Sequence, residues 1–99
     1  MTVGQGNRQT LTADGQNVAK IFAGPVRLVL SGGFGGGTAV LRSLDPSGVA
    51  INVVNGSFTA VTDTLFDFPE NSLNVLDVDI SGSTTPTLAV WIQGRRVGE

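Results

Sequence analysis

The sequence predicts an all-β domain, an antiparallel β-sandwich of about seven or eight strands with jelly-roll-like or immunoglobulin-like topology. Three observations predict this class. Segments rich in Val, Leu, Ile and Thr recur from residue 8 to residue 93, and Gly, Pro and Asn-Gly turn signals separate them. No longer window carries the apolar spacing and the capping residues of a helix. The pattern leaves open which of the two topologies the strands adopt.

The expected strands are short and alternate apolar with polar residues, as half-buried strands do. In chain order they lie at residues 8–12, 16–22, 26–31, 38–44, 49–54, 57–62, 73–81 and 87–93. The segment 64–68 either continues the strand before it or forms a short strand of its own.

Two dipeptides predict tight hairpins. Asp14-Gly15 lies between the first two expected strands, and Asn55-Gly56 lies between the strands at 49–54 and 57–62. Asn and Gly tolerate a positive φ, so the second dipeptide suits a type I′ turn.

Proline and glycine residues indicate where other expected strands begin and end. Gly24-Pro25 is expected to interrupt the chain before the strand at 26–31. Residues 45–48 place Pro and Gly suitably for a turn, and residues 69–72 predict another turn.

The alternation also predicts which side chains form the core. Apolar residues on one face of each strand are expected to point inward. They are Val26, Leu28, Leu30, Val40, Ile51, Val53, Phe58, Leu76, Val78, Ile80, Leu88, Val90 and Ile92. The opposite faces carry Arg27, Arg42, Asp77, Asp79 and Trp91, together with the apolar Val29, Ala39, Leu41 and Val61.

A chain of 99 residues is long enough for one domain with a modest core. We expect a flexible N-terminal arm over residues 1–7, a single domain over residues 8–93 and a C-terminal tail over residues 94–99. No stretch approaches the roughly 18 apolar residues that a membrane-spanning helix needs.

The composition excludes most catalytic devices. The chain has no His, no Cys and no Tyr, so a Ser-His-Asp or Cys-His arrangement is impossible and zinc lacks its usual ligands. The net charge of −2 gives no basic footprint for nucleic acid. We therefore predict that the protein is not an enzyme, uses no cofactor, and has no nucleic-acid or membrane partner.

Asp77 and Asp79 form a candidate cation-binding pair. Asp77 and Asp79 share one strand face, where they could bind a hard cation such as Ca²⁺. No Gly-bearing EF-hand loop surrounds them, so the favoured interpretation is an outer face that is solvated or forms a salt bridge with Arg27 or Arg42 on a neighbouring strand.

The run from Gly32 to Gly37 resembles a phosphate-binding loop only in its glycine content. It lacks the Lys-Ser/Thr that ends such a loop, and no helix is expected after it. We interpret it as a tight connection whose Phe34 inserts between the sheets or into a neighbouring chain.

Charged residues make up 14% of the chain, against about 25% in typical soluble proteins. Either partner subunits cover part of the surface, or Ser, Thr, Asn and Gly keep it solvated. Trp91 is expected to anchor an interface, cover the edge of the core or stack on a ligand. The candidate interface residues are Phe34, Val29, Leu41, Trp91, Arg95 and Arg96.

Four stretches resemble a family of small bacteriophage virion proteins. They are residues 26–41 with their Ser-Gly-Gly-Phe-Gly-Gly-Gly turn, Asp-Pro-Ser-Gly at 45–48, Asn-Gly-Ser-Phe-Thr-Ala at 55–60, and residues 77–92 ending in Val-Trp-Ile. The chain departs from the family pattern at Leu73-Asn74-Val75, where an Arg would be expected. The resemblance implies a structural role in a capsid, tail or fibre, and it supplies no catalytic residues.

Together these observations predict a non-enzymatic virion structural protein, a capsid decoration or cement protein that binds and stabilises the assembled shell. Its expected partners are the major capsid protein or other virion proteins, and a second copy in a homodimer or homotrimer. Its expected location is the virion, which assembles in the host cytoplasm. The alternative is a carbohydrate-binding or host-surface adhesion module associated with a tail or fibre.

Overall fold

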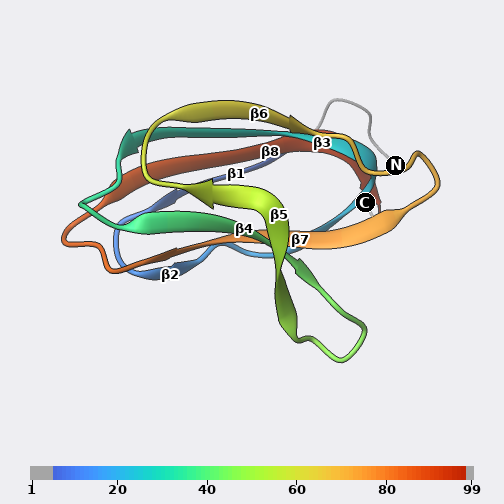
Figure 1. The fold of residues 1–99 in the computed structure, drawn as a ribbon, viewed down its shortest axis with the longest axis horizontal. Coiled ribbons are helices and arrows are strands. Elements are labelled where there is room, and N and C mark those ends of the chain that lie inside the picture. Colours follow the sequence, from blue (N-terminus) through green and yellow to red (C-terminus); the bar gives the residue numbers. More distant parts are fainter. Residues whose placement is uncertain (1–5, 98–99) are drawn as a thin grey trace.

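The computed structural model describes residues 6–97. The regular secondary structure in this range consists of strands alone. The strands are β1 (Gly6–Leu11), β2 (Gly15–Gln16), β3 (Lys20–Gly33), β4 (Thr38–Leu44), β5 (Ala50–Phe58), β6 (Thr62–Phe66), β7 (Leu73–Ser81) and β8 (Thr87–Val97) (Figure 1). The prediction of an all-β antiparallel domain is confirmed. Residues 6–97 contain no helix of the length and apolarity that crossing a membrane requires.

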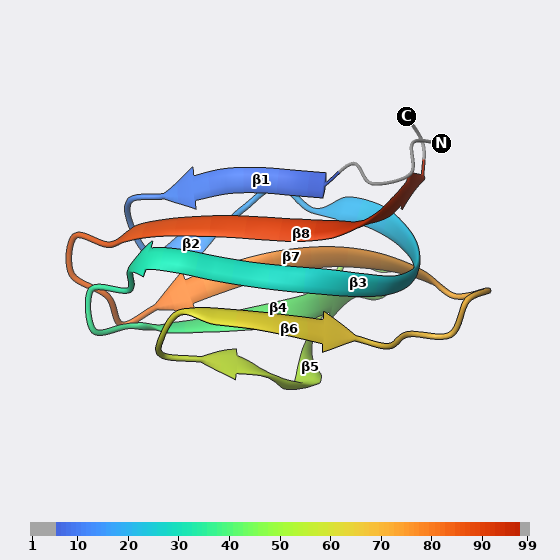
Figure 2. The same cartoon turned by 90° about the horizontal axis from the view of Figure 1, so that it is seen from above.

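The strands pair in a nested order. β1 pairs with β8, β2 with β7, β3 with β6 and β4 with β5, all antiparallel. Ladders between β8 and β3 and between β7 and β4 complete two groups, β1-β8-β3-β6 and β2-β7-β4-β5. Figure 2 shows the first group side by side. Residues 20–23 of β3 also pair with β7, which joins both groups in one open sheet. The predicted division into two separate sheets is therefore not confirmed.

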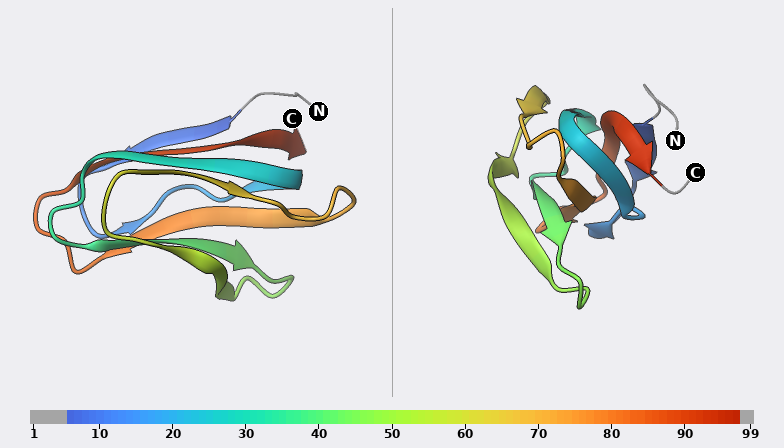
Figure 3. Two further views of the ribbon diagram at one scale, coloured as in Figure 1. Left: turned by 45° about the horizontal axis from the view of Figure 1, so that its top comes forward. Right: turned by 90° about the vertical axis from the view of Figure 1, so that its right-hand side faces the viewer.

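The sheet curls around one hydrophobic core, to which both groups contribute (Figure 3). Nine of the predicted core residues are buried, and Val53 and Phe58 pack against them while only partly buried. The nine are Val26, Leu28, Leu30, Leu76, Val78, Ile80, Leu88, Val90 and Ile92. Burial of this continuous apolar cluster supplies the main driving force for folding.

The inward face of β4 is the opposite of the one predicted. Ala39 and Leu41 are fully buried, whereas Val40 is only half-buried, beside Asp79. The three consecutive apolar residues of β4 do not indicate by themselves which face is inward. The register decides it, because Ala39 and Leu41 pair with buried residues of β7.

The predicted hairpin at Asn55-Gly56 is wrong, because β5 runs without reversal through both residues. Asn55 has a φ of 62°, the positive value that the dipeptide favours. The result is a bulge: residues 53–56 lie opposite Leu41 alone, between the pairs that join β4 to β5 on either side. Gly56 is buried there, where an added Cβ would lie 3.2 Å from the Cβ of Leu41.

Ile51 is 57% exposed, contrary to its predicted place in the core. The register puts Ile51 on the same side as Ser43 and the buried Leu76. The first part of β5, however, projects from the body of the molecule (Figure 1), and Ile51 is largely exposed there.

Gly24-Pro25 does not interrupt the chain but bends β3. The pairing with β8 shifts register between Ala23 and Arg27, and Gly24 has a φ of 74°. Pro25 has no N–H to donate, and such residues are tolerated in strands at bulges. The bend lets the first part of β3 pair with β7 and the second part pair with β6.

The predicted hairpin at Asp14-Gly15 is also wrong, because β1 pairs with β8 and β2 pairs with β7. Distant contacts explain the difference. Asn17 donates its backbone N–H to the carbonyl of Val78 at 3.1 Å, and its Oδ1 accepts the Val78 N–H at 2.8 Å. These bonds direct the chain towards β7 and away from β1.

The carboxylate of Asp14 joins two turns at one end of the sheet. Its Oδ1 accepts hydrogen bonds from the hydroxyl and the N–H of Ser83, and its Oδ2 accepts one from the N–H of Gly82 at 3.2 Å. These donors, the Ser83 hydroxyl first, hold the pKa of Asp14 below its ordinary value of 3.8.

Asp14→Asn is expected to lower the urea midpoint of unfolding at neutral pH and to have little effect in strong acid. A carboxyl group whose pKa is lowered by folding stabilises the fold above its unfolded pKa, and this contribution is lost as the pH falls through the folded pKa. Urea titrations of both proteins across the acid range provide the measurement. A difference in midpoint that persists in strong acid would contradict this role for the carboxylate.

The two ends of the domain differ from the predicted boundaries. β8 continues to Val97, so residues 94–97 belong to the sheet and not to a tail, and Arg95 pairs with Ala23 of β3. β1 begins at Gly6, within the predicted arm. The rest of that arm and residues 98–99 lie outside the described residues. The end of β8 has a partner because residues 21–23 of β3, before its bend, pair with residues 95–97.

Candidate functional site

The outer face of the β1-β8-β3-β6 group carries the single Trp of the chain. The ladder register places Arg8, Trp91, Val29 and Asp63 in one row across the four strands. On β8, Trp91 follows the buried Val90, and alternation along the strand directs its side chain away from the core. The prediction that Trp91 lies opposite the core face of β8 is confirmed.

Two guanidinium groups flank the Trp91 ring. The Cζ of Arg8 lies 4.8 Å from the ring centroid and the Cζ of Arg27 lies 5.9 Å from it. Both distances are within the range of cation–π attraction. The ring is therefore held between two cationic side chains from the strands on either side.

The two arginines differ in their other partners. Arg27 donates from Nε and Nη2 to the two carboxylate oxygens of Asp63, at 2.8 and 2.6 Å. These hydrogen bonds raise the pKa of Arg27 and lower the pKa of Asp63. Within residues 6–97, no carboxylate forms an ion pair with Arg8. The positive charge of Arg27 is thus neutralised locally, whereas no carboxylate of the described residues neutralises that of Arg8.

A pocket of about 340 Å³ lies beside the ring, and we call it the Trp91 pocket. The small Ala89 of β8 lies between Thr10 of β1 and Ser31 of β3, two residues along β8 from Trp91. The lining residues are Arg8, Thr10, Val29, Ser31, Ala89, Val90 and Trp91. The pocket therefore combines one cationic group, two hydroxyl groups and apolar surface.

Two of the predicted interface residues are not on the surface. Leu41 is fully buried and Phe34 is 7% exposed, and both belong to the hydrophobic core. Leu41 is buried because β4 has the opposite inward face from the predicted one. Phe34 inserts into the core from the Gly-rich loop, the first of the two placements that the sequence predicts for it.

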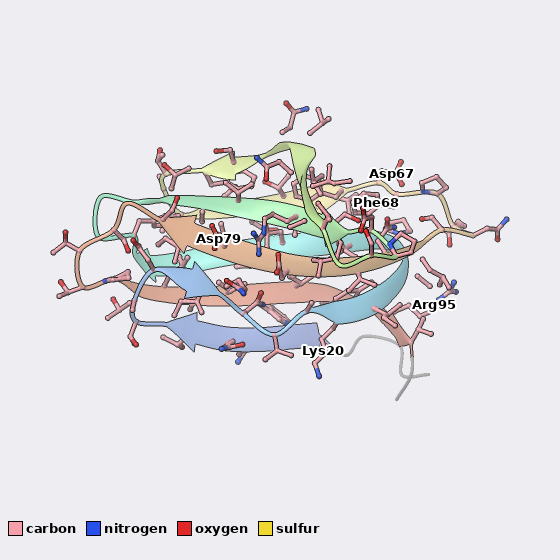
Figure 4. All side chains as sticks on the ribbon, turned by 90° about the horizontal axis from the view of Figure 1, so that it is seen from below. Lys20, Asp67, Phe68, Asp79 and Arg95 are labelled. Atoms are coloured by element: carbon pink, nitrogen blue, oxygen red, sulfur yellow. The ribbon has the colours of Figure 1, made fainter. Side chains whose placement is uncertain are left out.

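The remaining predicted interface residues lie in two places. Val29 and Trp91 are half-buried on the face just described. Arg95 lies towards the end of β8, far from the β7–β8 connection (Figure 4). Its Nε is buried and has no hydrogen-bond partner among the described residues. The side chain of Arg96 lies outside the described part of the structure.

A second exposed feature is the turn between β4 and β5, which projects from the body of the molecule (Figure 1). We call residues 45–55 the β4–β5 projection. The Oδ1 of Asp45 holds the turn by accepting hydrogen bonds from the N–H groups of Ser47 and Val49, both at 2.9 Å. Three apolar side chains are largely exposed on this element: Val49 at 57%, Ile51 at 57% and Val54 at 81%.

The Asp77 carboxylate is part of a salt bridge. Arg42 donates from Nε and Nη2 to the two oxygens of Asp77, at 2.9 and 2.8 Å, and these bonds raise the pKa of Arg42. The predicted pairing with a neighbouring arginine is confirmed for Asp77. Among residues 6–97, no three His, Cys, Asp or Glu side chains gather into a group that could hold a metal ion.

Comparison with protein-family models, with curated proteins and with solved structures finds no match to this chain. The surfaces described above therefore carry the functional argument.

Arg8 and the exposed apolar residues of the β4–β5 projection are not predicted as functional residues from the sequence. Arg8 becomes a neighbour of Trp91 only through the pairing of β1 with β8. A hairpin between the first two strands would have given it a different neighbour. The alternation in the strand containing Ile51 predicts that this side chain is buried, whereas it is 57% exposed.

Proposed function

We propose that the chain is a non-enzymatic virion structural protein, a capsid decoration or cement protein, and that the β4–β5 projection contacts a neighbouring subunit. One observation carries the proposal. Val49, Ile51 and Val54 are each more than half exposed on an element that projects from a folded domain with its own core. The three side chains lie within six consecutive residues, and contiguous exposed apolar surface marks contact sites in soluble proteins.

Burial of these side chains against a partner would provide favourable free energy. Complete burial of a Val or Ile side chain contributes about 1.5–3 kcal/mol relative to exposure. The edge of β5 offers unpaired backbone N–H and C=O groups to a partner, since among the described residues β5 pairs only with β4. A shell subunit could cover both the apolar side chains and this edge.

The strand order is compatible with such a role. The first strand pairs with the last, the second with the seventh, the third with the sixth and the fourth with the fifth. This nested order is that of a jelly roll, an architecture that occurs in viral capsid and lectin domains. Because one fold serves many functions, the projection and not the strand order carries the proposal.

Stabilisation of a shell would follow from selective binding. A protein that binds the assembled lattice but not the loose subunit shifts the equilibrium towards the assembled state. We propose that the chain acts as a dimer or trimer, because several projections on one oligomer would engage neighbouring subunits together.

The direct test is to search for the chain in virus particles isolated from cultures of its natural source. Antibodies to the purified chain are expected to label these particles, and the chain is expected to sediment with them through a sucrose gradient. Light scattering after size-exclusion chromatography would give its oligomeric state. A chain found only in particle-free fractions would argue against a virion role.

Ile51→Asp is expected to weaken binding to these particles at least tenfold without lowering the thermal midpoint of unfolding. The side chain is already largely exposed, so the charge costs little in the free chain, but it would be buried without a partner in the contact. Co-sedimentation at increasing chain concentration measures the affinity.

Val18→Asp is the matched control, since Val18 is 59% exposed and follows β2 at the other edge of the β2-β7-β4-β5 group. It is expected to bind as the unmodified chain does. Equal loss of binding in both variants would show a general effect of charge and not a contact at the projection.

A further inference from the structure

The Trp91 pocket has the composition of a ligand site and is independent of the β4–β5 projection. It lies on the β1-β8-β3-β6 group, whereas the projection belongs to the other group of strands. Its volume of about 340 Å³ lies within the size range of small-molecule sites, which is about 300–1,000 Å³.

Arg8 is the group best placed to recognise a negative charge. It is exposed, and no carboxylate of the described residues forms an ion pair with it. Its guanidinium lies against the Trp91 ring, a contact that orients the group while leaving N–H donors for a ligand. A carboxylate matches this donor fork and can accept two parallel hydrogen bonds from it.

The neighbouring Arg27 does not compete for the same ligand. Asp63 occupies its Nε and Nη2 donors. Among the described residues, Arg8 is therefore the cationic group of the pocket without a paired carboxylate, and its charge favours a ligand with one negative charge.

The rest of the lining indicates more than a bare anion. Thr10 and Ser31 bring two hydroxyl groups to the pocket, one on each side of Ala89. Each hydroxyl can donate and accept a hydrogen bond. Val29, Ala89 and Trp91 add apolar surface to the same pocket. A ligand that satisfies all of these groups has a negative charge, several hydroxyls and a face of C–H groups.

We propose that the Trp91 pocket binds an acidic sugar, a pyranose ring that carries a carboxylate. The carboxylate pairs with Arg8, the ring hydroxyls reach Thr10 and Ser31, and the C–H face of the ring packs against the apolar surface beside Trp91. This site would let the protein attach to an acidic polysaccharide, a role beyond assembly into a particle.

The test uses glucuronate as the acidic sugar, glucose as the neutral sugar of the same ring size, and acetate as the carboxylate alone. Trp91 is the only Trp, so its fluorescence reports on this pocket without interference from another Trp. Isothermal titration calorimetry gives a second readout. Glucuronate is expected to bind saturably with a Kd at least tenfold below those of glucose and acetate, and more weakly at high salt.

Arg8→Gln is expected to raise the Kd for glucuronate about tenfold and to remove the preference over glucose, with no change in the thermal midpoint of unfolding. Lys20→Gln, which removes the same charge from a residue that does not line the pocket, is expected to leave both affinities unchanged.

Three results would overturn the proposal. Equal binding of acetate and glucuronate would show a simple anion site. Unchanged glucuronate binding by Arg8→Gln would place the ligand elsewhere. No saturable response to glucuronate would show that the pocket does not take this class of ligand. None of these results depends on whether the β4–β5 projection binds a virion subunit, so the two proposals stand or fall separately.

Discussion

Arg42→Ala is expected to lower the free energy of unfolding by about 3 kcal/mol, because it leaves a buried carboxylate without its partner. The side chain of Asp77 is 4% exposed and that of Arg42 is 21% exposed. In the folded protein both oxygens of Asp77 accept hydrogen bonds from Arg42. Removal of the guanidinium would leave this negative charge with little water to solvate it.

Arg27→Ala is the matched control for this prediction. The Arg27–Asp63 pair has the same two-bond geometry, but its side chains are 47% and 54% exposed. Exposed pairs contribute little to stability, because water solvates the groups when the pair is broken. Urea unfolding followed by circular dichroism would measure both variants. Equal losses of stability in the two variants would mean that burial of the ion pair does not determine how much its removal costs.

Gly35→Ala is expected to destabilise the protein by about 2–5 kcal/mol, the sum of backbone strain and steric overlap. Gly35 has a φ of 60°, a conformation that residues with a Cβ rarely adopt. An added Cβ would also lie 2.5 Å from the carbonyl oxygen of Thr84. The overlap would push apart the Gly-rich loop and the β7–β8 connection, where Thr84 donates its N–H to the carbonyl of Gly35 at 2.9 Å.

Gly36→Ala separates these two causes. Gly36 has a φ of 76°, so the strain is similar, but an added Cβ would meet no atom within 4 Å. The expected cost is about 1–2 kcal/mol, that of the left-handed conformation alone. Thermal and urea unfolding of the two variants would show the difference. A Gly36→Ala variant as unstable as Gly35→Ala would mean that the left-handed backbone conformation, and not close packing, accounts for the loss of stability.

The structure explains why residues 32–37 are rich in glycine. Glycine content alone is typical both of an anion-binding loop and of a tightly packed connection. The structure supports the second interpretation: Phe34 is buried in the core, and an added Cβ at Gly35 or Gly37 would overlap the chain between Ser81 and Thr84.

Local pattern was sufficient for the class of the fold and for most of its strands. The segments at 38–44 and 73–81 are strands with the predicted bounds. The faces of β7 and β8 are also as predicted, because their apolar residues alternate with polar or less apolar ones. Such signals lie within a few neighbouring residues, so no knowledge of the partner strand is needed to read them.

Only the tertiary structure decided how the strands pair, and with that the composition of the candidate sites. Asp14-Gly15 and Asn55-Gly56 have the local chemistry of hairpin turns, yet neither reverses the chain onto the preceding strand. Contacts with Ser83, more than sixty residues away, compete with the local preference at Asp14. In the same way, Arg8 meets Trp91 only because the first strand pairs with the last.

The sequence by itself therefore determined that this protein is built from short antiparallel strands and lacks the residues of the common catalytic triads. The nested strand order, the Trp91 pocket and the β4–β5 projection were decided by the tertiary structure. The physical reason is that alternation and turn preference are properties of adjacent residues, whereas pairing and exposure depend on contacts between residues distant in the chain.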